Sequence, residues 1–215
     1  MRDWSEWVGA PAPGAPLVFL LAGEPEGLVA PLRAALEPAV AQGTCPAFLL
    51  AGLSPVDWDR DYSPWPAQGS QGRAFAGEAR ALLPRVQETI ARLQARYPLG
   101  EAVYPVGYSL GGLAALYFHC EAGFSGCGSC SGSLWYPGWL EYLEARAPGG
   151  KIYLSLGGKE KNARDPLMRT VEEATCQTKA LLSASARCTF VHEPGGHFRD
   201  VPQRLARAIA WLLGA

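Results

Sequence analysis

A serine, a histidine and two carboxylates in this sequence have the spacing needed for nucleophilic catalysis. Ser109 lies in the motif Gly-Tyr-Ser-Leu-Gly-Gly, between an apolar run and a helical pattern. Glycine two residues before and two residues after a serine is typical of a sharp turn from a strand to a helix, where larger side chains would collide. Such a turn places the serine at a helix N-terminus, which favours negative charge. The pattern predicts Ser109 as a catalytic nucleophile.

A serine hydroxyl is a weak nucleophile and needs a base, usually histidine. His119 follows Ser109 by ten residues in the same predicted helix, about 15 Å along its axis, and is too far away. His197 lies in Pro-Gly-Gly-His, between the last predicted strand and the last predicted helix, where two glycines let the backbone turn the ring inward. We therefore expect His197 to be the base, with His192, at the end of the last predicted strand, as the alternative.

The acid that orients the base should lie between the serine and the histidine in the chain. The loop after the predicted strand 151–156 contains Glu160 and Asp165. Asp165 precedes Pro166 and is typical of a helix N-cap, because proline is well tolerated at the first helical position. We assign Glu160 as the orienting acid and Asp165 as the cap, with the reverse assignment as the alternative.

Such a site also needs hydrogen-bond donors for the developing oxyanion and a surface for the substrate. One predicted donor is the backbone amide of Leu110, and the second should come from Glu24 or its neighbour Gly23, after the first predicted strand. Three aromatic residues that follow predicted strands are candidates to line the cleft: Tyr108, Trp65 and Trp135. The segment 57–66 is equally compatible with a loop packed on its own Trp and Pro side chains. Its Asp-x-Asp-x-Asp spacing lacks the glycine and glutamate of a calcium loop.

These residues require a scaffold that brings the ends of several strands together. Short apolar runs predict strands at 17–22, 46–51, 101–107, 127–134, 151–156 and 187–192. Helical patterns lie between them at about 26–37, 76–97, 110–121, 138–145, 165–183 and 200–213, the last with Asp200 as its expected cap. This alternation predicts a mostly parallel central sheet with helices on both faces, and active residues at the carboxyl ends of its strands.

Composition narrows the class of protein. The chain has 215 residues, of which 48% are hydrophobic and 18% charged, so we expect one folded α/β domain over residues 1–215. A net charge of −1 provides no basic footprint for nucleic acid. The apolar runs are shorter than the roughly 20 residues of a membrane span, and the N-terminus lacks a signal pattern. We expect a cytoplasmic protein with no membrane or nucleic-acid partner.

Six cysteines are present, and Cys127 and Cys130 form a Cys-x-x-Cys pair. A redox pair of this kind should begin a helix, whereas this segment has the composition of a strand. A zinc site would need a second pair of ligands at suitable spacing, which the sequence lacks. We expect reduced, buried cysteines that pack as small apolar residues, and we predict no metal and no cofactor.

With these residues assembled, the chain resembles the α/β-hydrolase esterases of the enterochelin-esterase and S-formylglutathione-hydrolase type. The likeness runs from about residue 17 to the end, through the motifs GYSLGG, SGSLWYP, SLGGKEKN, GGHF and DWDRDYSPWPA. It implies a three-layer α/β-hydrolase fold in a short bacterial member, with a minimal cap because 215 residues leave no room for a large lid. It also implies Ser109 as nucleophile, Glu160 as acid and His197 as base. No cluster of basic residues is evident in the sequence.

Residues and resemblance together predict a serine hydrolase that cleaves a small-molecule carboxylic ester or thioester through an acyl-enzyme. Two alternatives use the same scaffold: an acyltransferase or amidase with the same triad, and a non-catalytic binding module. The intact serine, acid, histidine and elbow glycines favour an enzyme, since binding alone would not require all of them.

Overall fold

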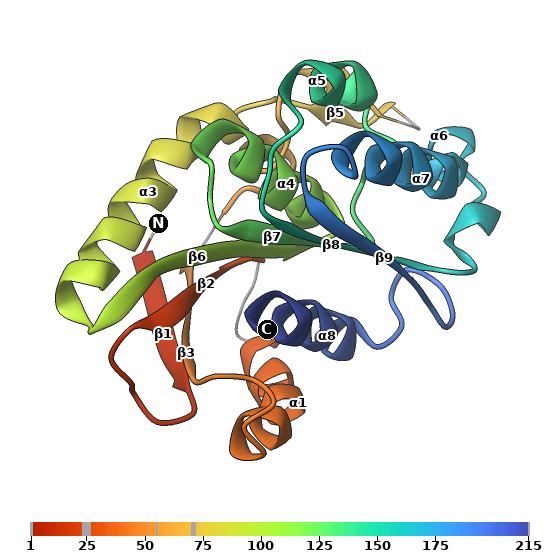
Figure 1. Cartoon of the computed structure of the whole chain (residues 1–215). Helices are drawn as coiled ribbons and strands as arrows, with labels where there is room; N and C mark the ends of the chain where they lie inside the picture. The colour runs from red at the N-terminus through yellow and green to blue at the C-terminus, as the bar shows by residue number, and fades with distance from the viewer. Residues whose placement is uncertain (1, 23–26, 55, 70–71, 215) are drawn as a thin grey trace.

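A mostly parallel sheet lies at the centre of the protein. The computed structural model describes residues 2–22, 27–54, 56–69 and 72–214. Within these residues, seven strands pair in the order β1-β3-β2-β6-β7-β8-β9 (Figure 1). Their bounds are β1 (Arg2–Val8), β2 (Ala15–Leu21), β3 (Phe48–Ser54), β6 (Leu99–Tyr108), β7 (Gly126–Cys130), β8 (Lys151–Gly157) and β9 (Arg187–Glu193). Every neighbouring pair is parallel except β1 and β3, which are antiparallel.

Helices cover both faces of this sheet, as Figure 1 shows. One face carries α1 (Val29–Ala41) and α8 (Val201–Leu213). The other carries α3 (Ala79–Arg96), α4 (Leu110–Ala122), α5 (Trp139–Arg146) and α7 (Val171–Leu182). The short elements are α2 (Trp58–Asp61), β4 (Ala67–Gln68), β5 (Ala74–Phe75), the 3-10 helix η2 (Glu160–Asn162) and α6 (Pro166–Arg169). The predicted three-layer α/β architecture is therefore confirmed.

Strand β2 shows why the sheet has two buried faces. Leu17, Phe19 and Leu21 belong to the core under α3, α4 and α7, whereas Val18 and Leu20 belong to the core under α1 and α8. Side chains alternate between the faces of a strand, so a continuous apolar run suits a sheet covered on both sides. Helix α4 is buried along most of its length, which places its N-terminus firmly against the sheet.

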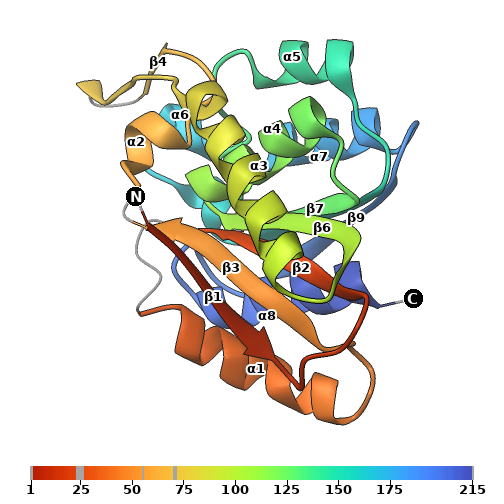
Figure 2. The ribbon, with the colours of Figure 1, turned by 90° about the vertical axis from the view of Figure 1, so that its left-hand side faces the viewer.

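The predicted strands and helices recur with shifted ends, and a few details differ. Strand β1 is not predicted from the sequence; Figure 2 shows it alongside β3 at the sheet edge. The predicted strand 127–134 ends at Cys130. The predicted helix 165–183 is divided at Thr170 into α6 and α7. The expected capping role of Asp200 is wrong: Asp200 adopts a left-handed conformation with φ 55° and makes no side-chain cap hydrogen bond. Among the described helices, none is long and apolar enough to cross a membrane.

Candidate active site

Ser109 lies in a tight turn between β6 and α4. Its φ is 55° and its ψ is −122°, a strained conformation for a residue with a side chain. A Cβ atom on Gly107 would lie 2.1 Å from the carbonyl oxygen of Gly111, and one on Gly111 would lie 2.3 Å from that of Leu21. The chain can turn this sharply only with glycine at both positions, which is the physical reason for the motif.

The start of α4 provides a donor near Ser109. Leu110 is the first residue of α4, so its amide has no acceptor within the helix. Ser133, in the loop after β7, contacts the turn. Its amide donates to the Ser109 carbonyl at 3.0 Å, and its Oγ lies 3.5 Å from Ser109 Oγ. Both candidates for the second oxyanion donor, Gly23 and Glu24, lie outside the described residues.

The structure brings His197 and Glu160 together from two loops at the same edge of the sheet. Glu160 begins η2, which follows β8, and His197 lies between β9 and α8. His197 Nδ1 is 2.6 Å from Glu160 Oε2. The Lys159 amide donates to the Gly195 carbonyl at 3.0 Å and ties the two loops together. The arrangement allows the Nδ1–H group to donate to the carboxylate and leaves Nε2 as an acceptor.

Glu160 is nearly enclosed by hydrogen-bond donors. Its Oε1 accepts from Ser131 Oγ at 2.7 Å and from the Gly157 amide at 2.7 Å, and lies 3.2 Å from Nη1 of Arg204. Burial raises the pKa of Glu160, but the hydrogen bonds from His197, Ser131 and Gly157 outweigh it and leave the pKa below its usual value. The carboxylate is therefore ionised at neutral pH.

The two other histidines lie away from Ser109 and Glu160. His119 is buried in α4 with Nε2 2.8 Å from the Gly149 carbonyl, and burial lowers its pKa. His192 is exposed at the end of β9, with Nδ1 3.9 Å from Glu172. Of the three histidines, His197 is the one that the structure places against an acid of the predicted site.

Asp165 has the capping geometry that its sequence context predicts. Its Oδ1 accepts from the amides of Leu167 and Met168, both at 2.9 Å, at the start of α6. Pro166 occupies the first turn. The geometry thus favours Glu160 over Asp165 as the acid.

The predicted catalytic residues share one cavity. Ser109, Glu160 and His197 all line a cavity of about 670 Å³. Tyr108 and Trp135, two of the predicted cleft residues, line it as well. Its volume is in the range of small-molecule sites.

Trp65, the third predicted cleft residue, does not line this cavity. It packs against the rings of Tyr117, Tyr136 and Tyr142, with centroid distances of 5.2–6.4 Å. Its indole Nε1 donates to the Pro137 carbonyl at 2.8 Å. The assignment of Trp65 to the cleft is wrong, because aromatic packing holds it between α4 and α5.

The acidic segment before Trp65 has a local structural role. Asp57 accepts from the Arg60 amide at 3.1 Å and caps α2, and Asp61 accepts from the Asp57 amide at 2.8 Å. Trp58 of the same helix lines the cavity. Across the described residues, no group of three or more His, Cys, Asp or Glu side chains has the arrangement of a metal site.

Cys127 and Cys130 lie within β7, and both are fully buried. All six cysteines are among the described residues and none forms a disulfide. Burial raises the pKa of Cys130 to about 12, so its thiol is protonated at neutral pH. Neither cysteine of the pair has the exposure or acidity of a redox-active thiol.

The sequence-based hypothesis omits Ser131 and Arg204, which both contact Glu160. Ser131 follows β7 in a left-handed conformation with φ 45°, and a bare serine after a strand carries little signal. Arg204 has a clearer sequence signal, because it lies three residues after Val201 and next to Leu205, on the apolar stripe of α8. A lone cation on an apolar helix face indicates a buried partner.

Comparisons with known proteins identify this architecture. No protein-family model matches the chain. The uncharacterized protein YbbA of Bacillus subtilis (strain 168) is 26% identical over 204 residues, which cover 83% of this chain and 78% of YbbA. Solved structures match more completely. The siderophore hydrolase EstB of Aspergillus nidulans matches with a TM-score of 0.78 and 18% identity, over 99% of this chain and 90% of EstB.

Two bacterial structures match in the same way. An IroE-like serine hydrolase of Shewanella oneidensis has a TM-score of 0.77 and 20% identity, over 94% of this chain and 71% of its own. The enterobactin esterase FES of Shigella flexneri has a TM-score of 0.78 and 23% identity, over 98% of this chain and 55% of FES. The chain has an α/β-hydrolase fold. In this fold, the residues after β6, β8 and β9 lie at one edge of the sheet, where the cavity opens.

Proposed function

We propose that this protein is a serine hydrolase that cleaves a carboxylic ester or thioester through an acyl-enzyme intermediate. One observation carries the proposal: the 2.6 Å contact between His197 and Glu160 lies in the same cavity as a serine held in a strained turn at a helix N-terminus. Such a constellation of nucleophile, base and acid is recognised by its geometry and roles.

In this proposal, Glu160 accepts the Nδ1–H bond of His197 and fixes the tautomer in which Nε2 is the base. Nε2 takes the proton of Ser109 as Oγ attacks the carbonyl carbon of the substrate. The amide of Leu110 donates to the oxyanion, and loss of one such donor typically costs about 3–4 kcal/mol in barrier height. His197 then gives its proton to the departing alcohol or thiol. A water molecule deprotonated by His197 then attacks the acyl carbon, and His197 returns that proton to Ser109 Oγ as the bond to the acid breaks.

The structural neighbours support this chemistry. The names of EstB, the Shewanella oneidensis protein and FES describe a siderophore hydrolase, a serine hydrolase and an enterobactin esterase. Hydrolysis on the same fold favours an enzyme over a binding module here. The contact between the buried Glu160 and the partly exposed His197 favours it as well, because pure binding does not require an oriented imidazole.

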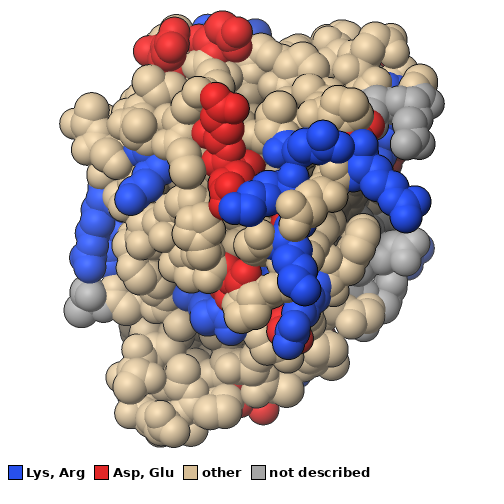
Figure 3. Space-filling view, turned by 90° about the vertical axis from the view of Figure 1, so that its right-hand side faces the viewer, with Lys and Arg blue, Asp and Glu red and all other residues tan. Residues whose placement is uncertain are grey.

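The rim of the cavity favours a substrate with negative charge. Figure 3 shows Lys and Arg side chains gathered on the face that lies to the right in Figure 1. The exposed cations of η2, α6 and the adjoining loops are Lys159, Lys161, Arg164, Arg169 and Arg199. Lys161 pairs with Glu172 and Arg199 with Asp200, whereas Lys159, Arg164 and Arg169 have no acidic partner among the described residues. Lys159 itself lines the cavity. This group of cations is not evident in the sequence, because neutral and acidic residues separate its members.

A fluorophosphonate probe tests the proposal directly, because it reacts covalently with an activated serine. We expect labelling of the wild-type protein and none of Ser109→Ala. Ser133→Ala is the matched control: it removes the hydroxyl 3.5 Å away and should still become labelled at Ser109. A panel of p-nitrophenyl esters and thioesters then measures turnover, and added alcohol or amine acceptors detect acyl transfer. Folded wild-type protein that is neither labelled nor active would support the binding-module alternative.

A further inference from the structure

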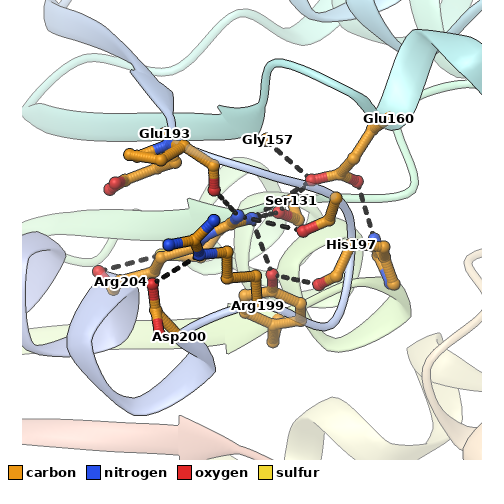
Figure 4. A network of polar contacts seen from close by, with 12 residues as sticks. Ser131, Gly157, Glu160, Glu193, His197, Arg199, Asp200 and Arg204 are labelled. Carbon is orange, nitrogen blue, oxygen red and sulfur yellow. Dashed lines mark hydrogen bonds and ion pairs between the residues drawn. The ribbon is translucent and has the colours of Figure 1, made fainter.

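Arg204 is a buried cation beside the pair formed by Glu160 and His197. It lies on α8, and its side chain is fully buried. Figure 4 shows its guanidinium between Glu160 and the loop that carries His197. Burying a charge is unfavourable unless it is paired and hydrogen-bonded, so the contacts of this side chain indicate what it does.

One half of the guanidinium contacts the acid. Nη1 of Arg204 donates to Glu160 Oε1 at 3.2 Å, to Ser131 Oγ at 2.9 Å and to the Tyr108 hydroxyl at 3.0 Å. Ser131 donates in turn to the same Oε1 atom. Since Oε1 is taken by this group of donors, Oε2 is the oxygen presented to His197.

The other half contacts the loop of the base. Nη2 of Arg204 donates to the carbonyls of Pro194 at 2.9 Å and Gly196 at 3.0 Å, directly before His197. The Tyr108 hydroxyl, which accepts from Nη1, donates to the His197 carbonyl at 2.6 Å. A planar guanidinium can serve both sets of acceptors at once, whereas the single ammonium of a lysine cannot span them.

We propose that Arg204 is a positioning residue that joins Glu160 and the His197 loop into one rigid unit. This inference rests on the proposed hydrolase function. The charge of Arg204 has a second effect: a nearby cation disfavours a proton on neighbouring groups. Arg204 therefore favours the ionised carboxylate of Glu160, which holds the Nδ1–H group of His197.

Other ionisable groups also surround the pair, and one of them, Lys159, is a second cation that the substitutions of Arg204 leave in place. Tyr108 on β6 and Cys130 on β7 both contact Arg204, Glu193 on β9 lies nearby, Lys159 is beside Glu160, and Arg199 and Asp200 follow His197. Burial raises the pKa values of Tyr108 and Cys130 to about 12, so both are neutral in an assay near pH 7. Glu193 pairs with Arg207 and Asp200 with Arg199. Arg204 is the cation in direct contact with Glu160.

Arg204→Met and Arg204→Lys test the proposal by kinetics on an aryl ester. We expect Arg204→Met to lower kcat by roughly 10- to 100-fold with little change in KM, the size expected for a misplaced reacting group. The acidic limb of its pH–rate profile should shift to higher pH by about one unit, because the cation that opposes protonation is gone. Arg204→Lys keeps the charge and should restore the limb, while kcat recovers only in part. Arg92→Met on α3 breaks an ion pair with Asp3 away from the cavity and should move neither quantity.

An NMR measurement of the His197 imidazole separates this inference from the proposed function, because it does not require turnover. The chain has three histidines, so His119→Gln and His192→Gln suffice for assignment. The Nδ1–H signal of His197 reports its hydrogen bond to Glu160. We expect this signal to broaden or disappear in Arg204→Met, because the His197 loop is no longer held against the acid. If the signal and the pH limb are unchanged in Arg204→Met, the proposal is wrong. If the signal is lost but wild type is not labelled by fluorophosphonate, the hydrolase function fails instead.

Should Arg204→Met fail to fold, Arg204→Lys still decides the matter. The lysine keeps a cation near Glu160 but loses the fork that reaches the carbonyls of Pro194 and Gly196. We expect kcat to fall by roughly tenfold with the pH limb in place. Wild-type kcat in Arg204→Lys would contradict the positioning role.

Discussion

Replacement of Glu160 by glutamine should reverse the tautomer of His197. In wild type, Glu160 Oε1 accepts from the Gly157 amide, from Ser131 and from Arg204, all within 3.2 Å. In Glu160→Gln, these donors would select the amide oxygen for that position, since an NH₂ group there would face three donors. The NH₂ group must then take the place of Oε2, 2.6 Å from His197 Nδ1. Nδ1 would have to accept, which puts the proton on Nε2 and removes the base.

The magnitude follows from this geometry. Neutralising the acid of a serine triad while keeping its shape, and so imposing the wrong tautomer, lowers kcat by about 10⁴-fold. That factor corresponds to about 5.4 kcal/mol in barrier height. KM should change little, because Glu160 is buried and the substitution alters proton transfer more than the surface that binds substrate. Burial of a neutral amide in place of the carboxylate leaves Arg204 without its anion, so some loss of stability should accompany the rate effect.

Steady-state hydrolysis of an aryl ester measures this effect. Thermal unfolding of each variant shows that it is folded at the assay temperature. Asp165→Asn is the matched control: asparagine caps helices as well as aspartate does, so the cap on Leu167 and Met168 should persist and kcat should stay within about twofold. A loss of at least 10³-fold in Glu160→Gln is expected on this reasoning. Near-normal kcat in folded Glu160→Gln, or a comparable loss in Asp165→Asn, would refute the assignment of the acid.

Three further predictions follow from single positions. Gly107→Ala places a Cβ atom 2.1 Å from the Gly111 carbonyl, so the turn must shift; we expect a lower Tm and at least tenfold slower fluorophosphonate labelling, and unchanged labelling would contradict the strained turn. Burial lowers the pKa of His119, so its stabilising contribution should be complete above pH 6.5 and be lost as pH falls below it; urea unfolding at pH 5 and pH 8 should show a smaller pH effect in His119→Gln. Lys159→Glu should raise KM several-fold for a carboxylate-bearing ester and leave KM for a neutral ester nearly unchanged, whereas equal effects on both would exclude a charge preference.

The sheet could be predicted from sequence because its parallel strands are buried on both faces. Such strands are continuous apolar runs, and β2 and β3 both have this character. β1 could not be predicted because it has no continuous apolar run. It is an edge strand of sequence RDWSEWV, with most of its side chains exposed or half-buried. Its position depends on antiparallel pairing with β3, which no local pattern encodes.

The site was predictable where a residue type is required by local backbone geometry. The elbow glycines and the histidine loop are of this kind, and both lie where strand ends place them. Trp65 was misplaced because its orientation depends on ring packing with Tyr117 and Tyr142, which belong to distant segments. Arg204 is on α8, 44 residues after the acid that it contacts. Contacts between helices and loops so far apart carry no spacing signal in one sequence.

Backbone strain and buried charge locate the same site without reference to the serine motif. Among the described residues, Ser109, Ser131 and Asp200 are the non-glycine residues with left-handed φ. Ser131 binds Glu160, and Asp200 directly precedes the helix that carries Arg204. Each such conformation costs on the order of 1–3 kcal/mol and persists only where the surroundings enforce it. Burial of the ion pair between Glu160 and Arg204 adds a desolvation penalty. These left-handed conformations and this buried ion pair lower the stability of the fold. Their presence together at one edge of the sheet supports a catalytic role for that edge, independently of the fold comparison.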